Sequence, residues 1–369
     1  MAETAGRELP AGTEQAPGTG ARPQRLVFMD WLRIYGFLVV FAYHALVNHE
    51  ALFAASGHPW LKSLWEHVCG WNVGISVGLF FLASGMGLML SAGKENFSAA
   101  QFYRRRFTAL LIPFYLAWVF ALLIGLPATA VHLTAVGHPV RNVLLTASAL
   151  DGFAAVRWGW QDWYLVGEWF LGTLVFLYLA FPLLRAACRW HPQVFLALCL
   201  AVCVTADALM TRAGLAQVMV SPLSRALPFC AGMYLAEEHR RGRGMTNAII
   251  GFGLLVLWIV FDISPKMPGI GIVQSDIRSL AIFTGAMLAE PVLARAGRRV
   301  NGAVKSIAAL TYALYLVHHV ILDACARLLP ADGSLKRAAL AVLAAAVLSC
   351  GAAILLKKGA AALIRKAAG

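Results

Sequence analysis

A long apolar stretch near the N-terminus carries the ionisable side chains Asp30, Arg33 and His44. It runs from residue 26 to 49, long enough to cross a bilayer, which takes about 20 apolar residues. An ionisable group inside a membrane span costs at least about 2.5 kcal/mol near its centre, so it usually faces the protein interior and marks a functional site. Arg33 and His44 fall within roughly 20° of each other on one helix face, about 16 Å apart in depth. That face would present a cation at one depth and an imidazole, a suitable general base, at another.

The same helix also fits a purely structural interpretation. Asp30 and Arg33 are one helical turn apart and could simply pair with each other. His44 would then be an interior histidine with satisfied hydrogen bonds. The helix alone does not decide between the two interpretations.

A second group of ionisable residues, Arg104, Arg105 and Arg106, directly precedes an apolar run that ends in Ile112-Pro113. Arginine suits phosphate because its planar guanidinium makes bidentate, charge-assisted hydrogen bonds. Such a cluster can equally follow the bias of cytoplasmic loops towards basic residues or contact anionic lipid. Phosphate binding and lipid contact therefore both remain open for it.

The composition indicates the class of protein that must position these residues. Of the 369 residues, 60% are hydrophobic and 13% charged, and the mean hydropathy is +0.70. Ordinary soluble domains carry about 25% charged residues, so we predict an all-α, polytopic membrane protein. The net charge of +13 does not indicate nucleic-acid binding, because the basic residues lie between apolar stretches and not on one soluble face.

Hydropathy divides the chain into a disordered tail (1–26), a helical membrane domain (27–356) and a basic tail (357–369). No cleavable signal precedes the first span, which we expect to be retained. Cysteine and histidine spacings predict neither a disulfide framework nor a metal site. We predict about ten transmembrane helices, each about 20 residues long, near 27–48, 73–92, 107–126, 164–186, 193–211, 222–238, 246–263, 276–294, 304–328 and 337–356.

The distribution of basic residues predicts the orientation of these helices. Of the 31 Lys and Arg residues, 20 fall in the tails and the alternate loops assigned to the cytoplasm, 7 in the other loops and 4 within spans. Lys and Arg accumulate in cytoplasmic segments. Both termini are therefore predicted to be cytoplasmic.

Five motifs, in order along residues 26–320, resemble those of the acyltransferase 3 family of membrane acyltransferases. They are Met29-Asp30-Trp31-Leu32-Arg33 with His44; Phe80-Phe81-x-x-Ser84-Gly85; Arg104-x-Arg106 before Ile112-Pro113; Trp163-x-Leu165-x-x-Glu168-x-Phe170 with Pro182; and Tyr312-x-x-Tyr315-Leu316-x-His318. The first and fourth motifs are closer to the branch that includes periplasmic-glucan succinyltransferases.

The resemblance implies an integral-membrane O-acyltransferase of a bacterial cytoplasmic membrane. It would move an acetyl, succinyl or similar group from cytosolic acyl-coenzyme A, a co-substrate, to a hydroxyl of a carbohydrate or other acceptor at or beyond the outer face. Arg104 and Arg106 would bind coenzyme A phosphates. Arg33 would bind the thioester arm or a phosphate. No bound cofactor or metal is expected.

The resemblance and the predicted depths also suggest catalytic roles. His44 would be the general base, and Glu168 would orient it or stabilise its protonated form. His318 is the competing base, and His318 and Arg225 are candidates for the acceptor site. We expect loss of His44 to reduce activity far more than loss of His318.

A transporter or flippase that uses the intramembrane charges as a pathway is the alternative function. The usual marker of such proteins, matched interrupted helices in two related halves, is not visible in the sequence. A sensor or scaffold without turnover is a third interpretation.

Overall fold

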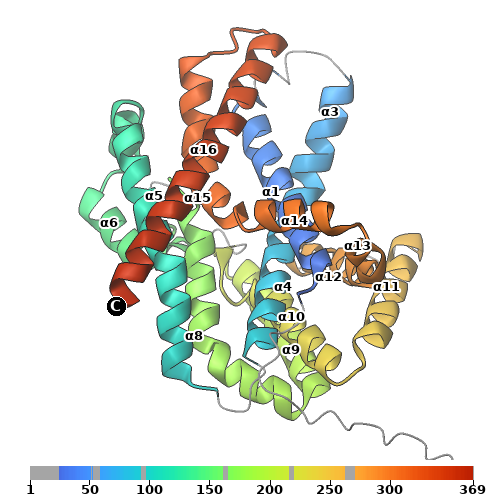
Figure 1. Ribbon diagram of the computed structural model, residues 1–369. Coiled ribbons are helices and arrows are strands. Elements are labelled where there is room, and N and C mark those ends of the chain that lie inside the picture. The colour runs from blue at the N-terminus through green and yellow to red at the C-terminus, as the bar shows by residue number, and fades with distance from the viewer. Residues whose placement is uncertain are drawn as a thin grey trace, which may run out of the picture.

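The computed structural model is built of helices (Figure 1). It describes residues 25–50, 52, 59–92, 97–160, 165–215, 220–261 and 271–368, and no strand occurs within those ranges. The predicted all-α class is therefore confirmed for this part of the chain. Most of the predicted N-terminal tail, residues 1–24, lies outside the described residues.

The helices overlap the predicted ranges, but α5 and α16 extend well beyond theirs, and several short helices are added. In chain order they are α1 (Val27–Val47), α3 (Pro59–Trp65), η1 (Glu66–Asn72), α4 (Val73–Ser91), α5 (Ala99–Val136), α6 (Pro139–Ser148), α7 (Asp151–Trp158), α8 (Glu168–Trp190), α9 (Pro192–Arg212), α10 (Ala226–Arg240), α11 (Gly244–Phe261), α12 (Gly271–Leu288), α13 (Glu290–Ala294), α14 (Arg298–Ala308), α15 (Thr311–Leu328) and α16 (Leu335–Ala368).

Helix α4 is the centre of the arrangement, packed against α1, α10 and α12 (Figure 1). Its contact with α10 is close because two glycines bring the backbones together. A Cβ on Gly85 would collide with the carbonyl oxygen of Phe229, and one on Gly232 would collide with that of Leu82. Small residues at a helix interface allow such an approach in membranes, where dispersion contacts drive association.

The start of α1 is hydrogen-bonded to a residue from the C-terminal third of the chain. The two carboxylate oxygens of Glu290 accept hydrogen bonds from the backbone N–H groups of Val27, at 2.9 Å, and Phe28, at 2.7 Å. The first N–H groups of a helix have no partner within the helix. Glu290 therefore caps α1 and fixes the helix that carries Arg33 and His44.

The predicted single helix over 304–328 is instead a bent pair. Helix α14 lies across α1, and the chain then turns by 52° into α15 (Figure 1). Helix α14 carries Arg298, Arg299 and Lys305, whereas α15 is largely apolar and buried. The basic face explains why α14 does not continue the direction of α15.

Six helices in the described ranges are long and apolar enough to cross a membrane, or seven if the bent pair counts as one span. They are Val27–Val47, Pro59–Ser91, Ala99–Leu123, Glu168–Trp190, Pro192–Arg212 and Leu335–Lys366. A multi-pass membrane protein is supported, but the predicted count of ten is not confirmed. Helix α10 has only 15 residues, and α12 contains Asp276 and Arg278.

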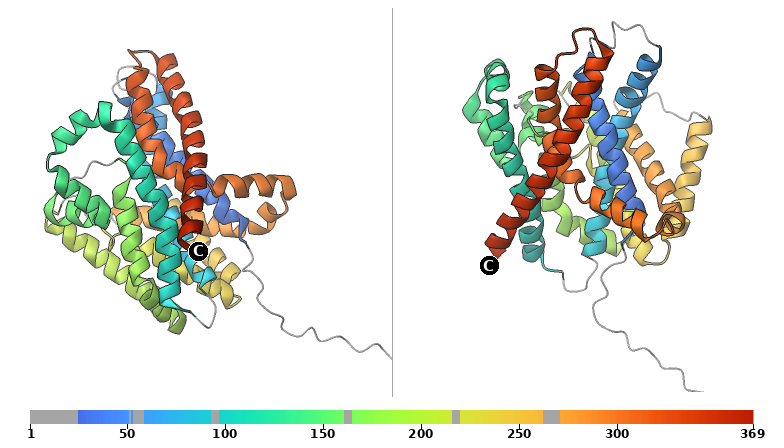
Figure 2. Two further views of the ribbon diagram at one scale, coloured as in Figure 1. Left: turned by 60° about the vertical axis from the view of Figure 1, so that its left-hand side comes forward. Right: turned by 45° about the horizontal axis from the view of Figure 1, so that its top comes forward.

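The structure does not test on which side of the membrane the two termini lie. Helix α16 runs on to Ala368, so most of the predicted basic tail continues the last helix. Helix α16 and α15 lie side by side in both views of Figure 2. The cytoplasmic placement of the termini remains a prediction.

Candidate functional site

A cavity of about 250 Å³ lies between α1, α4, α5, α8 and α15. Arg33 of α1 and Arg106 of α5 both line it, although they lie 73 positions apart in the sequence. Among the described residues of its lining there is no carboxylate. The two guanidinium groups therefore favour an anionic ligand in this cavity.

Each arginine of the cavity is oriented by a neighbouring polar group. Arg106 donates from Nη2 to the Ser91 hydroxyl at 2.8 Å. Arg33 Nη1 lies 3.4 Å from Asp30 Oδ1, and Asp30 also pairs with Arg25. The i,i+3 pairing expected between Asp30 and Arg33 is thus present, and it positions the cation that lines the cavity.

Hydroxyl groups add hydrogen-bonding capacity to the wall of the cavity. The Ser84 and Tyr178 hydroxyls are 2.9 Å apart, and either oxygen can donate. The Tyr312 hydroxyl donates to the Leu110 carbonyl at 2.8 Å. The cavity therefore combines two cations with fixed polar groups, an arrangement suited to a phosphate or an oxygen-rich chain.

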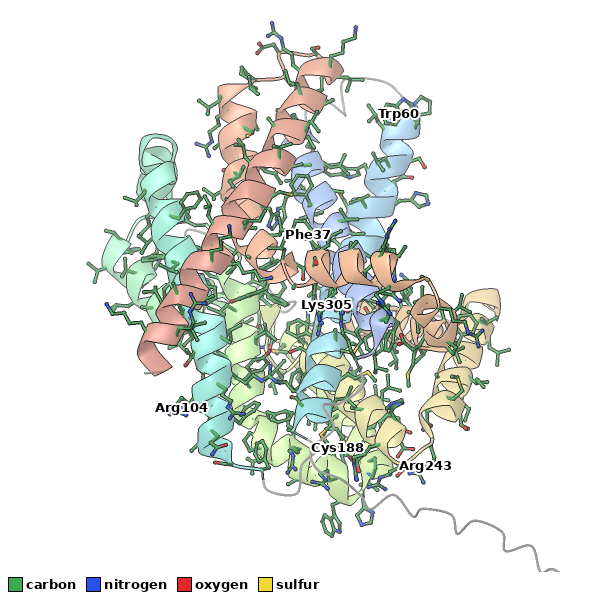
Figure 3. The ribbon with its side chains drawn as sticks, viewed as in Figure 1. Phe37, Trp60, Arg104, Cys188, Arg243 and Lys305 are labelled. Carbon is green, nitrogen blue, oxygen red and sulfur yellow. The ribbon has the colours of Figure 1, made fainter. Side chains whose placement is uncertain are left out.

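The two arginines predicted to act together lie on different faces of α5. Positions 104 and 106 are separated by about 200° around a helix. Arg106 lines the cavity, whereas Arg104 is exposed and lies at the outer edge of α5 (Figure 3). The structure brings Arg106 together with Arg33, and it does not place Arg104 in this cavity.

His44 and His318 lie together between α1 and α15. Their ring centroids are 5.2 Å apart, and His44 also lies 4.7 Å from His319. Phe37 precedes His44 by two turns of α1, and its ring packs edge-on against that of His318, with the centroids 5.7 Å apart. Phe37 lies towards the middle of the molecule (Figure 3). The two histidines that competed for the role of base are thus neighbours.

The hydrogen bond of His318 decides which of its nitrogens is basic. Its side chain is only 2% exposed, and Nδ1 lies 2.7 Å from the carbonyl oxygen of Tyr315. A carbonyl only accepts, so Nδ1 carries the proton and Nε2 of the neutral ring keeps its lone pair. Nε2 is buried without a hydrogen-bond partner among the described residues. It is therefore free to accept a hydrogen bond from a neighbouring group.

Tyr315 connects the cavity to the histidines. It lines the cavity, and its ring centroid lies 5.8 Å from that of His318. Its hydroxyl donates to the Gly167 carbonyl at 3.2 Å. Tyr315 therefore lies between the cavity and His318, although neither histidine is part of the cavity's described lining.

Glu168 lies at the same end of the site, at the start of α8. Its side chain is fully buried, and its oxygens accept from the backbone N–H groups of Leu165, at 2.9 Å, and Val166, at 3.1 Å. Gly167 between them has a φ of 76°, a conformation that glycine adopts without strain. Glu168 thus fixes the turn that receives the Tyr315 hydroxyl, while its predicted action on His44 remains a prediction.

Arg225 lies directly before α10 and is 2% exposed. Its Nη1 makes an ion pair with Asp276 of α12 at 3.1 Å. Ser224 beside it donates to Asp207 of α9 at 3.3 Å. Together the ion pair and this hydrogen bond join α9, the start of α10 and α12, and the role of Arg225 in binding an acceptor remains a prediction.

The fold and the site together define a class: a multi-helix membrane protein with a cationic, hydroxyl-lined cavity, one wall residue of which, Tyr315, contacts a buried histidine, His318. The chain matches the family of acyltransferase domains, acyltransferase 3, over residues 26–358, and it belongs to that family. The resemblance of the five motifs is confirmed, whereas the branch within the family remains a prediction. The chain matches no curated protein and no solved structure.

Some residues of the site were not assigned a role from the sequence. Ser84, Tyr312 and Tyr315 lie within the motifs, but nothing in their spacing indicated that they share a cavity with Arg33. Tyr178 lies in an apolar helix outside every motif and gave no signal at all. Trp163 of the fourth motif lies outside the described residues.

Proposed function

We propose that this membrane acyltransferase transfers an acyl group from acyl-coenzyme A to a hydroxyl of a carbohydrate or other acceptor. The observation that carries the proposal is that Tyr315 lines the same cavity as Arg33 and Arg106 and also contacts His318, the neighbour of His44. A site with cations that bind phosphate at one end and a base at the other end suits a phosphorylated thioester donor.

The size of the cavity determines which part of the donor can enter. At about 250 Å³ it is smaller than the roughly 300–1,000 Å³ typical of sites for drug-sized ligands. We therefore place only the phosphate-proximal arm of coenzyme A inside it, with the nucleotide outside. In this arrangement Arg106 and Arg33 bind phosphate, and the exposed Arg104 contributes less than Arg106.

The proposed reaction begins with proton transfer from the acceptor hydroxyl to His44. The hydroxyl oxygen attacks the thioester carbonyl carbon, and the C–S bond of the resulting tetrahedral intermediate breaks. The coenzyme A thiolate leaves and takes the proton from His44, while the acyl group remains on the acceptor oxygen. Each bond formed is matched by one broken, and no other reactant is needed.

His318 has a distinct part in this reaction. The lone pair of its Nε2 can accept a hydrogen bond from His44 once that ring becomes protonated. A group that stabilises the imidazolium as it forms lowers the barrier, as the carboxylate does in serine hydrolases. His44 acts on the acceptor because it is half-buried, whereas His318 is enclosed.

The experiment uses the full-length protein in sealed proteoliposomes with acetyl- and succinyl-coenzyme A labelled in the acyl group. Extracts of cells that lack the protein supply the acceptor, and label transferred to carbohydrate or another hydroxyl compound is measured. The expected result is protein-dependent label in an ester, lost in His44→Ala. Uptake of an unmodified solute without any ester product would support the transporter alternative and overturn the proposal.

A further inference from the structure

A second and larger cavity lies on the other side of α8, away from the proposed acyl-donor cavity. It encloses about 640 Å³ between α7, α8, α9, the residues Leu215 and 221–223, and the start of α10. Apart from Arg157, Ser221 and the thiols of Cys199, Cys203 and Cys230, its described lining consists of apolar side chains. The proposed transfer reaction gives no role to this cavity, named here the α8–α9 groove.

The length of the groove matches one leaflet of a bilayer. Its lining on α9 extends from Leu198 to Met210, and a rise of about 1.5 Å per residue gives roughly 18 Å. A bilayer has a hydrocarbon core about 30 Å thick, so one leaflet accounts for roughly 15 Å. The groove can therefore hold one extended hydrocarbon chain from the interface to the midplane.

The outer side of α9 indicates that hydrocarbon, and not water, surrounds the groove. Helix α9 is one of the apolar candidate spans, only 17% of its span is buried, and it lies beside α8 at the edge of the bundle (Figure 2). Val202 lines the groove and is still 54% exposed. The groove thus opens sideways to the region that the bilayer occupies.

One end of the groove carries the features of a membrane interface. Arg157 lines this end from the last turn of α7 and is exposed. The next side chains, Trp158 and Trp160, stack with ring centroids 4.7 Å apart. Tryptophan is enriched at the level of lipid head groups, and arginine binds phosphate through paired hydrogen bonds. The apolar groove is therefore headed by a cation at the depth of a lipid phosphate.

We propose that the α8–α9 groove binds an anionic phospholipid, with one acyl chain along α9 and the phosphate at Arg157. The charge at the mouth distinguishes this ligand from a zwitterionic lipid, whose ammonium group would meet the guanidinium. The proposal does not depend on the acyl-transfer reaction, because it concerns a different cavity.

The test is native mass spectrometry of delipidated, full-length protein titrated with phosphatidylglycerol, phosphatidylethanolamine or phosphatidylcholine of identical chains. The wild type should bind phosphatidylglycerol about tenfold more tightly than the other two lipids, as expected for a charge-assisted contact. Arg157→Gln should remove this preference. Val202→Trp, which fills the groove, should weaken the binding of all three lipids. Leu200 is exposed on α9 outside the groove, so Leu200→Trp should leave lipid binding unchanged.

The native cysteines provide a second readout, which in the wild type needs no substitution. Bound phosphatidylglycerol should slow maleimide alkylation of Cys199 in the groove and leave the exposed Cys350 unaffected. Protection should be lost in Arg157→Gln. Three results would each overturn the proposal. They are equal binding of the three lipids by the wild type, equal effects of Val202→Trp and Leu200→Trp on lipid binding, and a rate of Cys199 alkylation that does not change when phosphatidylglycerol is bound.

Discussion

The replacement His318→Asn tests the proposed division of labour between the two histidines. The asparagine amide nitrogen can reach the place of Nδ1 and keep the hydrogen bond to the Tyr315 carbonyl, which measures 2.7 Å in the structure. Nothing in asparagine replaces Nε2, which is buried without a hydrogen-bond partner among the described residues. The change therefore removes one lone pair and preserves the anchor of the side chain.

The size of the effect follows from the kind of interaction that is lost. A hydrogen bond to a charged group contributes about 1.5–3 kcal/mol. Since each 1.36 kcal/mol is a factor of ten in rate, His318→Asn should lower kcat by roughly 10- to 150-fold. His44→Ala removes the base itself and should lower kcat by about 10²- to 10⁴-fold. Affinity for acyl-coenzyme A should change little in either variant, because Arg33 and Arg106 are intact.

The assay combines single-turnover acyl transfer with equilibrium binding of acyl-coenzyme A to protein in nanodiscs. The double variant should be no slower than His44→Ala, because the lone pair of His318 has no imidazolium to stabilise once His44 is absent. Unchanged kcat in a folded His318→Asn protein would refute the reasoning. Losses that multiply in the double variant would show that the two histidines act independently and would refute it as well.

Further predictions concern the donor site, the helix contacts and the topology. Arg106→Lys should weaken acyl-coenzyme A binding about tenfold, since lysine keeps the charge but loses the bidentate guanidinium. Arg104→Lys should weaken binding less, and Arg105→Lys is the control. Equal affinity for acyl-coenzyme A in all three variants would remove Arg106 from the site. Gly85→Ala should lower the free energy of unfolding by about 1–3 kcal/mol through the collision with the Phe229 carbonyl, measured by thermal unfolding. In Gly87→Ala the new Cβ would lie 3.7 Å from its nearest neighbours, and an equal loss in this control would contradict the explanation. Glu290→Ala should cost about 0.5–2 kcal/mol by uncapping α1, and an unchanged melting temperature would show that the cap contributes nothing. A reporter fused after Gly369 should be cytoplasmic and one at Gly137 external, because basic residues accumulate in cytoplasmic segments; accessibility of the Gly369 reporter from outside sealed cells would refute the orientation.

Much of the fold follows from local properties of the chain. Apolar length predicts where a helix can cross a bilayer, because in hydrocarbon every backbone polar group must be bonded within the segment. The sequence by itself therefore determined the all-α class and the helices at 27–47, 168–190 and 192–212 to within a few residues. It predicted less well where charge interrupts an apolar run, as at Arg298 and Lys305, because hydropathy does not reveal that such a segment can lie across its neighbours.

Some features of the candidate site also follow from local properties of the chain. Helical periodicity alone placed Arg33 and His44 on one face of a helix, and it also separates Arg104 from Arg106 by about 200°. The family motifs identified His318 and Glu168 as residues of interest, but not what they contact. These are properties of single helices or of short motifs.

Only the tertiary structure decided which residues meet. His44 and His318 lie 274 positions apart and become neighbours because α1 and α15 pack against each other. The Tyr315 carbonyl fixes the proton of His318, and Tyr178, which is not a motif residue, completes the cavity from α8. Backbone geometry repeats identically along any helix and can be read locally, whereas contacts between helices depend on how side chains and glycines fit at every interface at once.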